Sequence, residues 1–166
     1  MLAIGIDPGT AITGYGLVRE LADGSLQVVD YGVIQTPAGQ AMPDRLVQIY
    51  QQLKQIIVLH SPQSGAVEKL FFARNVRTAL SVGQARGVVL LALAESGVDV
   101  AEYSPNEIKQ AVVGYGGAEK MQVQLMVKAL LDLEQIPQPD DAADALAVAI
   151  CHLHSARIRS LENRAE

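Results

Sequence analysis

Aromatic residues and cysteine are scarce in this sequence. Tryptophan is absent, and five Tyr and two Phe make up only 4% of the 166 residues, although 49% of the chain is hydrophobic. A buried core must therefore be built mainly from Val, Ile, Leu and Ala. The only cysteine, Cys151, excludes an internal disulfide and suits a reducing cytosol. We therefore expect a cytoplasmic protein in which Cys151 is a small buried side chain.

Long hydrophobic runs and an excess of basic residues are also missing. The longest apolar run, residues 88–94, is too short to span a membrane, and no basic segment precedes the apolar N-terminal residues, as it would in a signal peptide. The net charge is −5, whereas nucleic-acid-binding domains are usually basic. Residues 69–87 nevertheless form a locally basic stretch without any acid. The net charge is therefore a weak guide to what the protein binds.

Hydrophobic periodicity and turn signals predict alternating strands and helices. The predicted strands are residues 2–6, 13–19, 25–36, 65–68 and 98–103. The predicted helices are about residues 43–60, 75–96, 104–114, 118–133 and 140–160. Ser104 and Glu107 have the spacing of a capping box at the start of one helix. We expect a single domain over residues 1–160 and a charged, frayed tail over 161–166.

This order of elements predicts an α/β fold with a five-stranded mixed sheet. Short turns join the first three strands, so these should be antiparallel, and the last two should be parallel because helices connect them. Helices should flank the sheet on both faces. Strands 2–6 and 65–68 are expected to be neighbours, which would bring their carboxyl ends together. Ligands usually bind at such an edge of an open α/β sheet.

Four acidic residues are predicted to meet at this edge. Asp7 and Glu68 end the two neighbouring strands, and Asp141 and Asp144 lie three residues apart at the start of the last helix, so they should point the same way. Carboxylates this close repel one another unless a cation neutralises them. Ligands with oxygen only favour Mg²⁺ or Mn²⁺ over Zn²⁺. Two such ions about 4 Å apart could activate a water and stabilise a leaving oxygen.

Each acid also has an ordinary structural interpretation. Asp7 precedes Pro-Gly, where an aspartate often serves only to form a turn. Aspartates at a helix start commonly cap the helix and complement its dipole, and we favour this role for Asp140. Glu68 is harder to explain in this way, because it follows Ala and Val in an apolar strand, where an unpaired acid is rare.

Five segments resemble, in order, motifs of the RuvC family of Holliday-junction resolvases. They are IGIDPGTAITGYG (4–16), VEKLFFARN (67–75), SVGQARG (81–87), VVGYGGAEK (112–120) and DAADAL (141–146). The first motif alone would be weak, but five motifs in register over nearly the whole chain are specific.

The resemblance implies a ribonuclease H-like homodimer that hydrolyses two opposed strands of a four-way DNA junction and leaves 5′-phosphate and 3′-hydroxyl ends. By the same resemblance, Asp7, Glu68, Asp141 and Asp144 are catalytic acids that bind two Mg²⁺ ions per site, with Mn²⁺ able to substitute. Some members have His at position 141, so this sequence follows the all-carboxylate version, and Asp140 could assist Asp141. The resemblance also implies cooperation with the RuvA–RuvB branch-migration complex and places the dimer interface on helix 75–96.

Further residues match DNA-contacting positions of the family. Lys109 and Lys120 match basic positions near the scissile phosphate, where they would hold phosphate oxygens, although a single helix lysine is more often simply solvated. Phe71 matches an aromatic that stacks on unpaired bases, a contact worth about 1–3 kcal/mol per base, with core packing as the alternative for Phe71 or Phe72. The resemblance assigns backbone contacts to Arg74, Asn75 and Arg77, which could equally lie on a solvated helix face.

Other functions remain open at this stage. Sugar kinases, acetate kinases and Hsp70-type ATPases also use an Asp-x-Gly turn, but they pair two such domains, and this chain has one motif. A non-catalytic DNA-binding scaffold should lack at least one of the four acids. A nuclease for RNA–DNA hybrids would share the metal site and differ only in its substrate.

Overall fold

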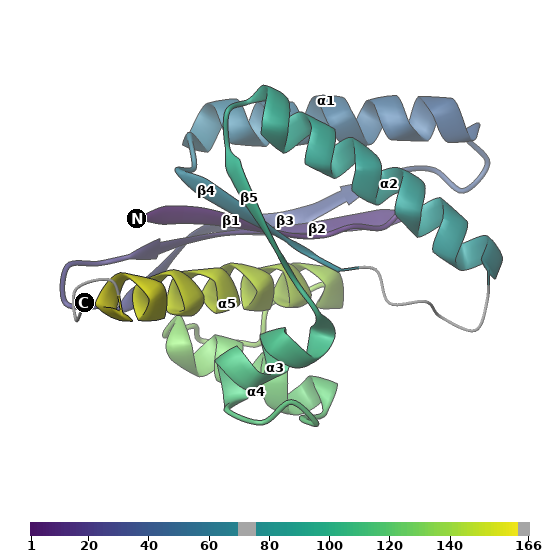
Figure 1. Ribbon diagram of the computed structural model, residues 1–166. Coiled ribbons are helices and arrows are strands. Elements are labelled where there is room, and N and C mark those ends of the chain that lie inside the picture. The colour runs from purple at the N-terminus through teal and green to yellow at the C-terminus, as the bar shows by residue number, and fades with distance from the viewer. Residues whose placement is uncertain (70–75, 163–166) are drawn as a thin grey trace.

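The computed structural model describes residues 1–69 and 76–162, and side chains within 1–69 and 78–159 (Figure 1). The strands are β1 (Leu2–Asp7), β2 (Ile12–Glu20), β3 (Leu26–Gln35), β4 (Ser64–Glu68) and β5 (Asp99–Tyr103). The helices are α1 (Met42–His60), α2 (Val76–Glu95), α3 (Pro105–Val113), α4 (Lys120–Leu130) and α5 (Asp140–Glu162). Each predicted element is present in the predicted order.

The ends of α4 differ most from the prediction of residues 118–133. The helix begins two residues later because Glu119 caps it, with the Gln122 side chain accepting a hydrogen bond from the Glu119 backbone at 2.8 Å. It ends at Leu130, and Asp132 then takes a left-handed backbone conformation with φ 50°. Glutamate is not among the preferred capping residues, so the pattern of residue types did not reveal this start.

The five strands form one mixed sheet in the order β3-β2-β1-β4-β5. Strands β1, β2 and β3 pair antiparallel, and β4 joins β1 and β5 in parallel pairs. The predicted fold class is therefore confirmed. Because β1 and β4 are parallel and adjacent at the centre, both carboxyl ends reach the same edge of the sheet.

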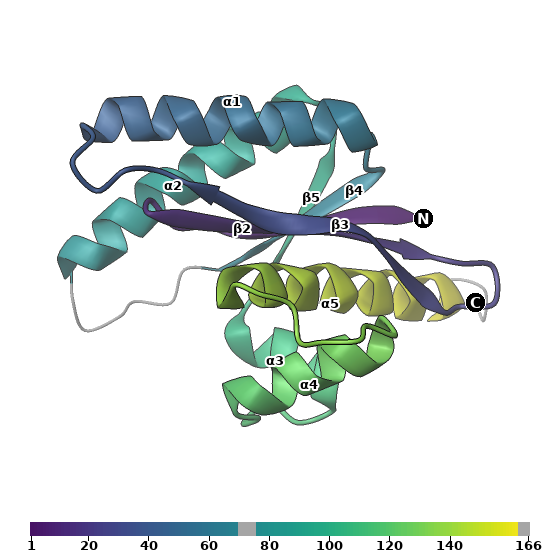
Figure 2. The ribbon, with the colours of Figure 1, turned by 180° about the vertical axis from the view of Figure 1, so that it is seen from behind.

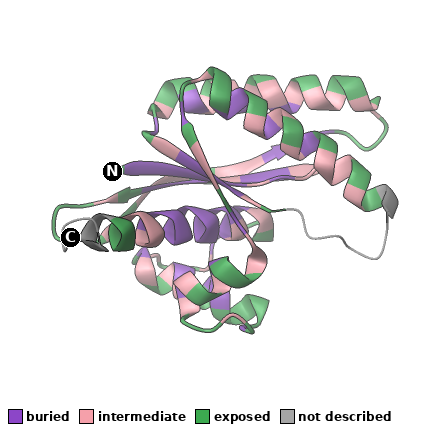
Figure 3. Ribbon diagram, in the orientation of Figure 1, coloured by how far each residue is buried: buried purple, intermediate pink, exposed green. Residues whose placement is uncertain are grey.

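Helices cover both faces of the sheet. Helices α1 and α2 lie on one face, and α3, α4 and α5 lie on the other (Figures 1 and 2). Two buried clusters correspond to these layers, one around Ile4, Ile6 and Leu53 and the other around Leu146 and Ile150. The buried residues run along the central strands and through the middle of α5, where residues 145–153 are all buried (Figure 3). None of the helices in the described ranges is both long and apolar enough to cross a membrane.

Helix α5 lies unusually close to the backbone of β1 and β2. A Cβ added to Gly5 would lie 2.2 Å from the carbonyl oxygen of Ala145, and a Cβ added to Gly14 would lie 2.0 Å from that of Asp141. Real Cβ atoms do not approach backbone atoms so closely, so both positions require glycine. The inner side of α5 is correspondingly rich in alanine. This close packing fixes the start of α5 beside the carboxyl end of β1.

Replacing Gly14 by Ala should displace the start of α5, because the new methyl group would overlap the Asp141 carbonyl. We expect Gly14→Ala to lower the free energy of unfolding by about 2–3 kcal/mol, measured by thermal or urea unfolding. The control is Gly39→Ala, since a Cβ at Gly39 would have no neighbour within 4 Å. Equal stability of the two variants would show that α5 does not depend on this glycine.

Candidate active site

Asp7 and Glu68 lie side by side at the carboxyl edge of the sheet. They are the last residues of β1 and β4, and the register pairs Ile6 with Val67 immediately before them. Side chains two residues apart in a strand point to the same face. Because Gly5 and Ala66 face α5, both carboxylates also project to the α5 side.

The turn after Asp7 is fixed by a buried threonine. The Thr13 hydroxyl donates a 2.6 Å hydrogen bond to the carbonyl of Gly9, and Thr13 is fully buried. The chain therefore leaves β1 through a closed loop and returns in β2 beside Asp7, where Gly14 pairs with Asp7. This arrangement keeps Asp7 at a defined place next to α5.

Helix α5 contributes the other two predicted acids. Asp141 and Asp144 lie in its first turns, and both are partly buried. Their charges act on Asp7, which places all four acids within one electrostatic cluster. The structure thus brings together Asp7, Glu68, Asp141 and Asp144 from three separate stretches of the chain.

Burial and mutual repulsion make ionisation of this cluster unfavourable. Desolvation is the largest cause that raises the pKa of Asp7 from 3.8 to about 7, and the charge of Glu68 is the next. Desolvation and the charge of Asp144 also raise the pKa of Glu68. Desolvation raises the pKa of Asp144, against the lowering effect of Lys120. Carboxylates whose pKa values are raised by burial and by neighbouring charges are typical of functional sites.

The donor set fits a hard divalent cation. All four groups are carboxylates, and a cation between them would relieve the repulsion that helps to raise the pKa values of Asp7, Glu68 and Asp144. Within residues 1–69 and 76–162, however, no three Asp, Glu, His or Cys side chains already surround a common point as metal ligands would. The four carboxylates therefore lie close together, but they do not surround a shared metal position.

Two lysines line a cavity beside the acids. The capping box of Ser104 and Glu107 is formed as predicted and fixes the start of α3, which carries Lys109. The cavity has a volume of about 260 Å³. It is lined by Glu68, Pro105, Ile108, Lys109, Lys120, Val123, Asp144 and Ala147. Both lysines thus face the same space as two of the acids.

Lys120 contacts the acids directly. Its Nζ lies 3.0 Å from Oδ2 of Asp144 and 3.3 Å from Oδ2 of Asp140. Although partial burial acts to lower it, the contacts with Asp144 and Asp140 hold the pKa of Lys120 above its ordinary value. Lys120 therefore supplies positive charge to the acid cluster from the start of α4.

Arg86 of α2 also reaches this edge of the sheet, although the sequence did not single it out as a site residue. Its Nε donates a 3.3 Å hydrogen bond to the carbonyl of Glu68, and its guanidinium pairs with Glu102. Arg86 lines a second cavity of about 200 Å³ together with Asp7, Glu68 and Lys69. Its sequence signals were its place in the basic stretch 69–87 and in the motif SVGQARG (81–87).

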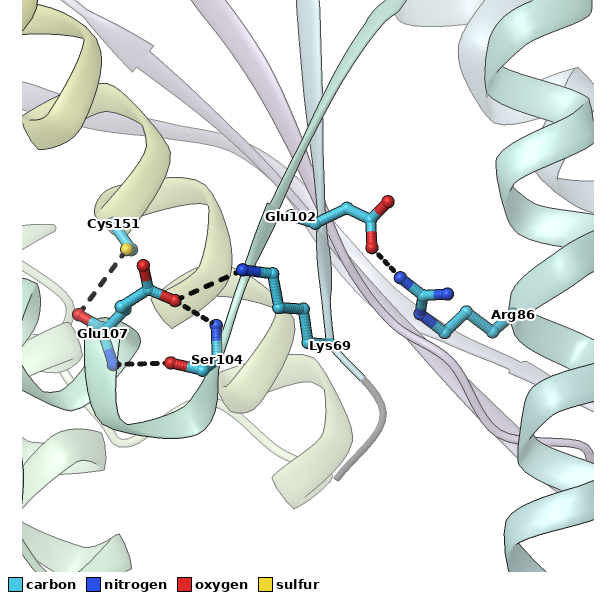
Figure 4. A network of polar contacts seen from close by, with 6 residues as sticks. All are labelled: Lys69, Arg86, Glu102, Ser104, Glu107 and Cys151. Atoms are coloured by element: carbon cyan, nitrogen blue, oxygen red, sulfur yellow. Dashed lines mark hydrogen bonds and ion pairs between the residues drawn. The ribbon is translucent and has the colours of Figure 1, made fainter. Parts of the chain in front are cut away.

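A polar network braces the ends of β4 and β5 next to the acids (Figure 4). Lys69 lies 3.8 Å from the Glu107 carboxylate, which also accepts a 2.7 Å hydrogen bond from the backbone of Ser104. Cys151 is buried as predicted, and its thiol lies 3.8 Å from the carbonyl of Glu107. These contacts tie α3 and α5 to the strand ends that present Glu68.

Four further residues were predicted to contact DNA. Phe71, Arg74 and Asn75 lie outside the described residues, and so does the side chain of Arg77 at the start of α2. Their assignments stay predictions.

The fold and the carboxylate cluster define a ribonuclease H-like metal-dependent nuclease. The family model of the crossover junction endodeoxyribonuclease RuvC matches residues 3–152, and the chain belongs to this family. The RuvC of Syntrophomonas wolfei is 57% identical over 160 residues, covering 96% of this chain and 92% of that protein.

Solved structures agree with this assignment. The structure of Thermus thermophilus RuvC is 37% identical and superimposes with a TM-score of 0.89, covering 95% of this chain and 96% of that one. The same RuvC in complex with a Holliday junction substrate is 34% identical, with a TM-score of 0.87 and the same coverage.

Removing one charge from the cluster should stabilise the metal-free protein. In the fold, Asp7 keeps its proton up to about pH 7, whereas the unfolded chain releases it near pH 3.8. Asp7 therefore lowers stability progressively as the pH rises from about 4 to 7. We expect Asp7→Asn to raise the free energy of unfolding in EDTA at pH 7.5 by about 1–3 kcal/mol, with little gain at pH 4.

Denaturant unfolding at both pH values measures this difference. Asp99→Asn is a suitable control, because Asp99 is exposed at the opposite end of the sheet, paired with the first residue of β4. A loss of stability in Asp7→Asn at pH 7.5 would contradict the repulsion inferred for the cluster.

Proposed function

We propose that this chain resolves four-way DNA junctions by Mg²⁺-dependent hydrolysis of phosphodiester bonds in two opposed strands, leaving 5′-phosphate and 3′-hydroxyl ends. The single observation that carries the proposal is the convergence of Asp7, Glu68, Asp141 and Asp144 at one edge of the sheet. Membership of the RuvC family supports the choice of substrate.

The four carboxylates would hold the metal ions. Bound there, two Mg²⁺ ions would supply an activated water and charge stabilisation of the leaving oxygen, and Mn²⁺ could substitute. The oxygen-only donor set supports these ions over Zn²⁺. Burial of Asp7 and Glu68 excludes water from one side of the cluster and strengthens its attraction for cations.

The lysines supply phosphate contacts. Lys109 and Lys120 line the cavity that adjoins Glu68 and Asp144, so their ammonium groups can bind non-bridging oxygens of a phosphate placed there. These contacts orient the phosphodiester and offset the charge that develops on it. Lys69 and Arg86 line a second cavity beside Asp7 and Glu68, where they offer two further cationic groups to the DNA backbone.

Residues 70–77 complete the DNA-binding surface in this proposal. Phe71 stacks on bases opened at the junction, and Arg74, Asn75 and Arg77 contact the sugar-phosphate backbone. This stretch runs from Lys69 to the start of α2 and follows the strand that presents Glu68, which supports these roles.

A homodimer would give the two cuts. Most exposed residues of α2 are uncharged, namely Thr78, Leu80, Gln84, Gly87, Leu91 and Ala94, and the exposed acid Glu95 ends the helix. Leu80 is 66% exposed and Leu91 is 54% exposed, so this face offers two large apolar side chains to a partner. Pairing two copies through this face would relate two active sites by a two-fold axis, as a pseudo-symmetric junction requires.

Membership of the RuvC family supports a proposal for the cellular setting. The protein acts in the cytoplasm as a single nuclease domain and works with the RuvA–RuvB branch-migration complex. The buried thiol of Cys151 supports a reducing compartment.

A synthetic four-way junction tests the activity. With Mg²⁺, the protein should cut two opposed strands, mapped on strands labelled one at a time, while a linear duplex of the same sequence stays intact. Asp7→Asn should reduce cleavage by at least about 1,000-fold because a ligand is lost, yet bind the junction normally in Ca²⁺. Substantial Mg²⁺-dependent cutting by Asp7→Asn would contradict the mechanism.

Charging the proposed interface tests the dimer. Leu91→Glu should weaken self-association by about 30-fold or more, measured by sedimentation over a dilution series. Val58→Glu is the matched control, because Val58 is 73% exposed on α1, away from the proposed face. Dissociation of both variants, or of neither, would argue against an interface on α2.

A further inference from the structure

Asp140 lies beside the acid cluster but faces other partners. Its Oδ1 accepts a 3.1 Å hydrogen bond from Nε2 of Gln124, and its Oδ2 lies 3.3 Å from Nζ of Lys120. Each carboxylate oxygen therefore has a separate partner on α4, while Asp140 itself is the first residue of α5.

Gln124 is a fixed anchor for this carboxylate. It is a polar side chain only 4% exposed, and it lies four residues after Lys120, on the same face of α4. Its hydrogen bond to Asp140 holds Oδ1, which leaves Oδ2 directed at the lysine. A buried polar group with a defined partner restricts that partner more than a solvated one can.

Lys120 contacts two carboxylates, and one of them is also proposed to bind metal. Asp144, 3.0 Å from the Lys120 Nζ, is one of the four proposed metal ligands. A metal ion bound by Asp144 would compete with the Lys120 ammonium for the negative charge of the Asp144 carboxylate. Asp140 would then be the remaining carboxylate that keeps the ammonium beside the cavity shared by Lys109 and Lys120. Without such an anchor, the long lysine side chain would be free to move into solvent.

We propose that Gln124 and Asp140 form a positioning pair that holds the Lys120 ammonium at the phosphate-binding cavity while Asp144 binds metal. Asp140 is thus a positioning residue that acts through Lys120 and is not a metal ligand. The inference rests on the proposed function, since it assigns Lys120 to a phosphate of the junction.

A double-mutant cycle on a synthetic four-way junction tests the pair under single-turnover conditions with Mg²⁺. Asp140→Asn keeps the acceptor for Gln124 but loses the charge facing Lys120, and it should slow cleavage by about 5- to 20-fold. Its junction Kd in Ca²⁺ should change by less than about 2-fold, since one exposed ion pair contributes little to binding. Asp140→Glu should restore part of the rate.

The effect must pass through Lys120. Lys120→Ala should slow cleavage by about 100-fold, and adding Asp140→Asn to it should cause no further slowing. Gln124→Met, which keeps most of the buried volume but removes the donor, should slow cleavage in the same Lys120-dependent manner. Asp132→Asn, the same change at an exposed acid between α4 and α5, is the control and should cut at the wild-type rate.

Three results would overturn the positioning role. They are an unchanged or faster rate for Asp140→Asn, an equal slowing by Asp140→Asn in the Lys120→Ala background, and loss of Mn²⁺ binding in Asp140→Asn measured by EPR. If the wild-type protein itself fails to cut the junction, the proposed function fails and this inference falls with it. If the wild-type protein cuts the junction and Asp140→Asn cuts it at the same rate, only the proposal of the positioning pair is disproved.

Discussion

Close contact between α5 and the backbone of β1 and β2 determines where the chemistry can occur. Gly5 and Gly14 remove the side chains that would hold this helix away, and the alanines of α5 match them. The helix start is thereby placed at the carboxyl end of β1, so Asp141 and Asp144 reach Asp7. The same packing buries the acids, which raises the cost of their charges. The packing of α5 therefore sets both the position of the acids and the cost of ionising them.

The acid cluster is unfavourable for stability and useful for function. Burial and repulsion raise the pKa of Asp7 to about 7, and the protein tolerates this because strong packing on both faces of the sheet holds the strands. Lys120 compensates part of the negative charge. A cation would compensate the rest, which explains why a site built only from carboxylates selects hard divalent metals. Unfavourable burial and repulsion of charges are common at functional sites, where a bound ligand is expected to relieve them.

Much of this arrangement follows from the sequence, because it depends on local patterns. Alternation and apolar runs identify the strands, and parallel pairing of β1 with β4 brings Asp7 and Glu68 together. The contacts of Arg86, Gln124 and Asp140 could not be predicted, because they depend on how helices far apart in sequence cross the sheet edge. The roles of Gly5 and Gly14 were equally hidden, since a glycine in a strand does not reveal which helix approaches it.

Binding of metal to the free protein tests the central claim most directly, because it requires neither DNA nor catalysis. In a Mn²⁺ titration followed by EPR, the wild-type protein should bind the ion, and Glu68→Gln and Asp144→Asn should each weaken binding by about 10-fold or more. These two residues come from different elements, so a shared loss would show that their carboxylates serve one site. Binding of Mn²⁺ by both variants with wild-type affinity would contradict the account.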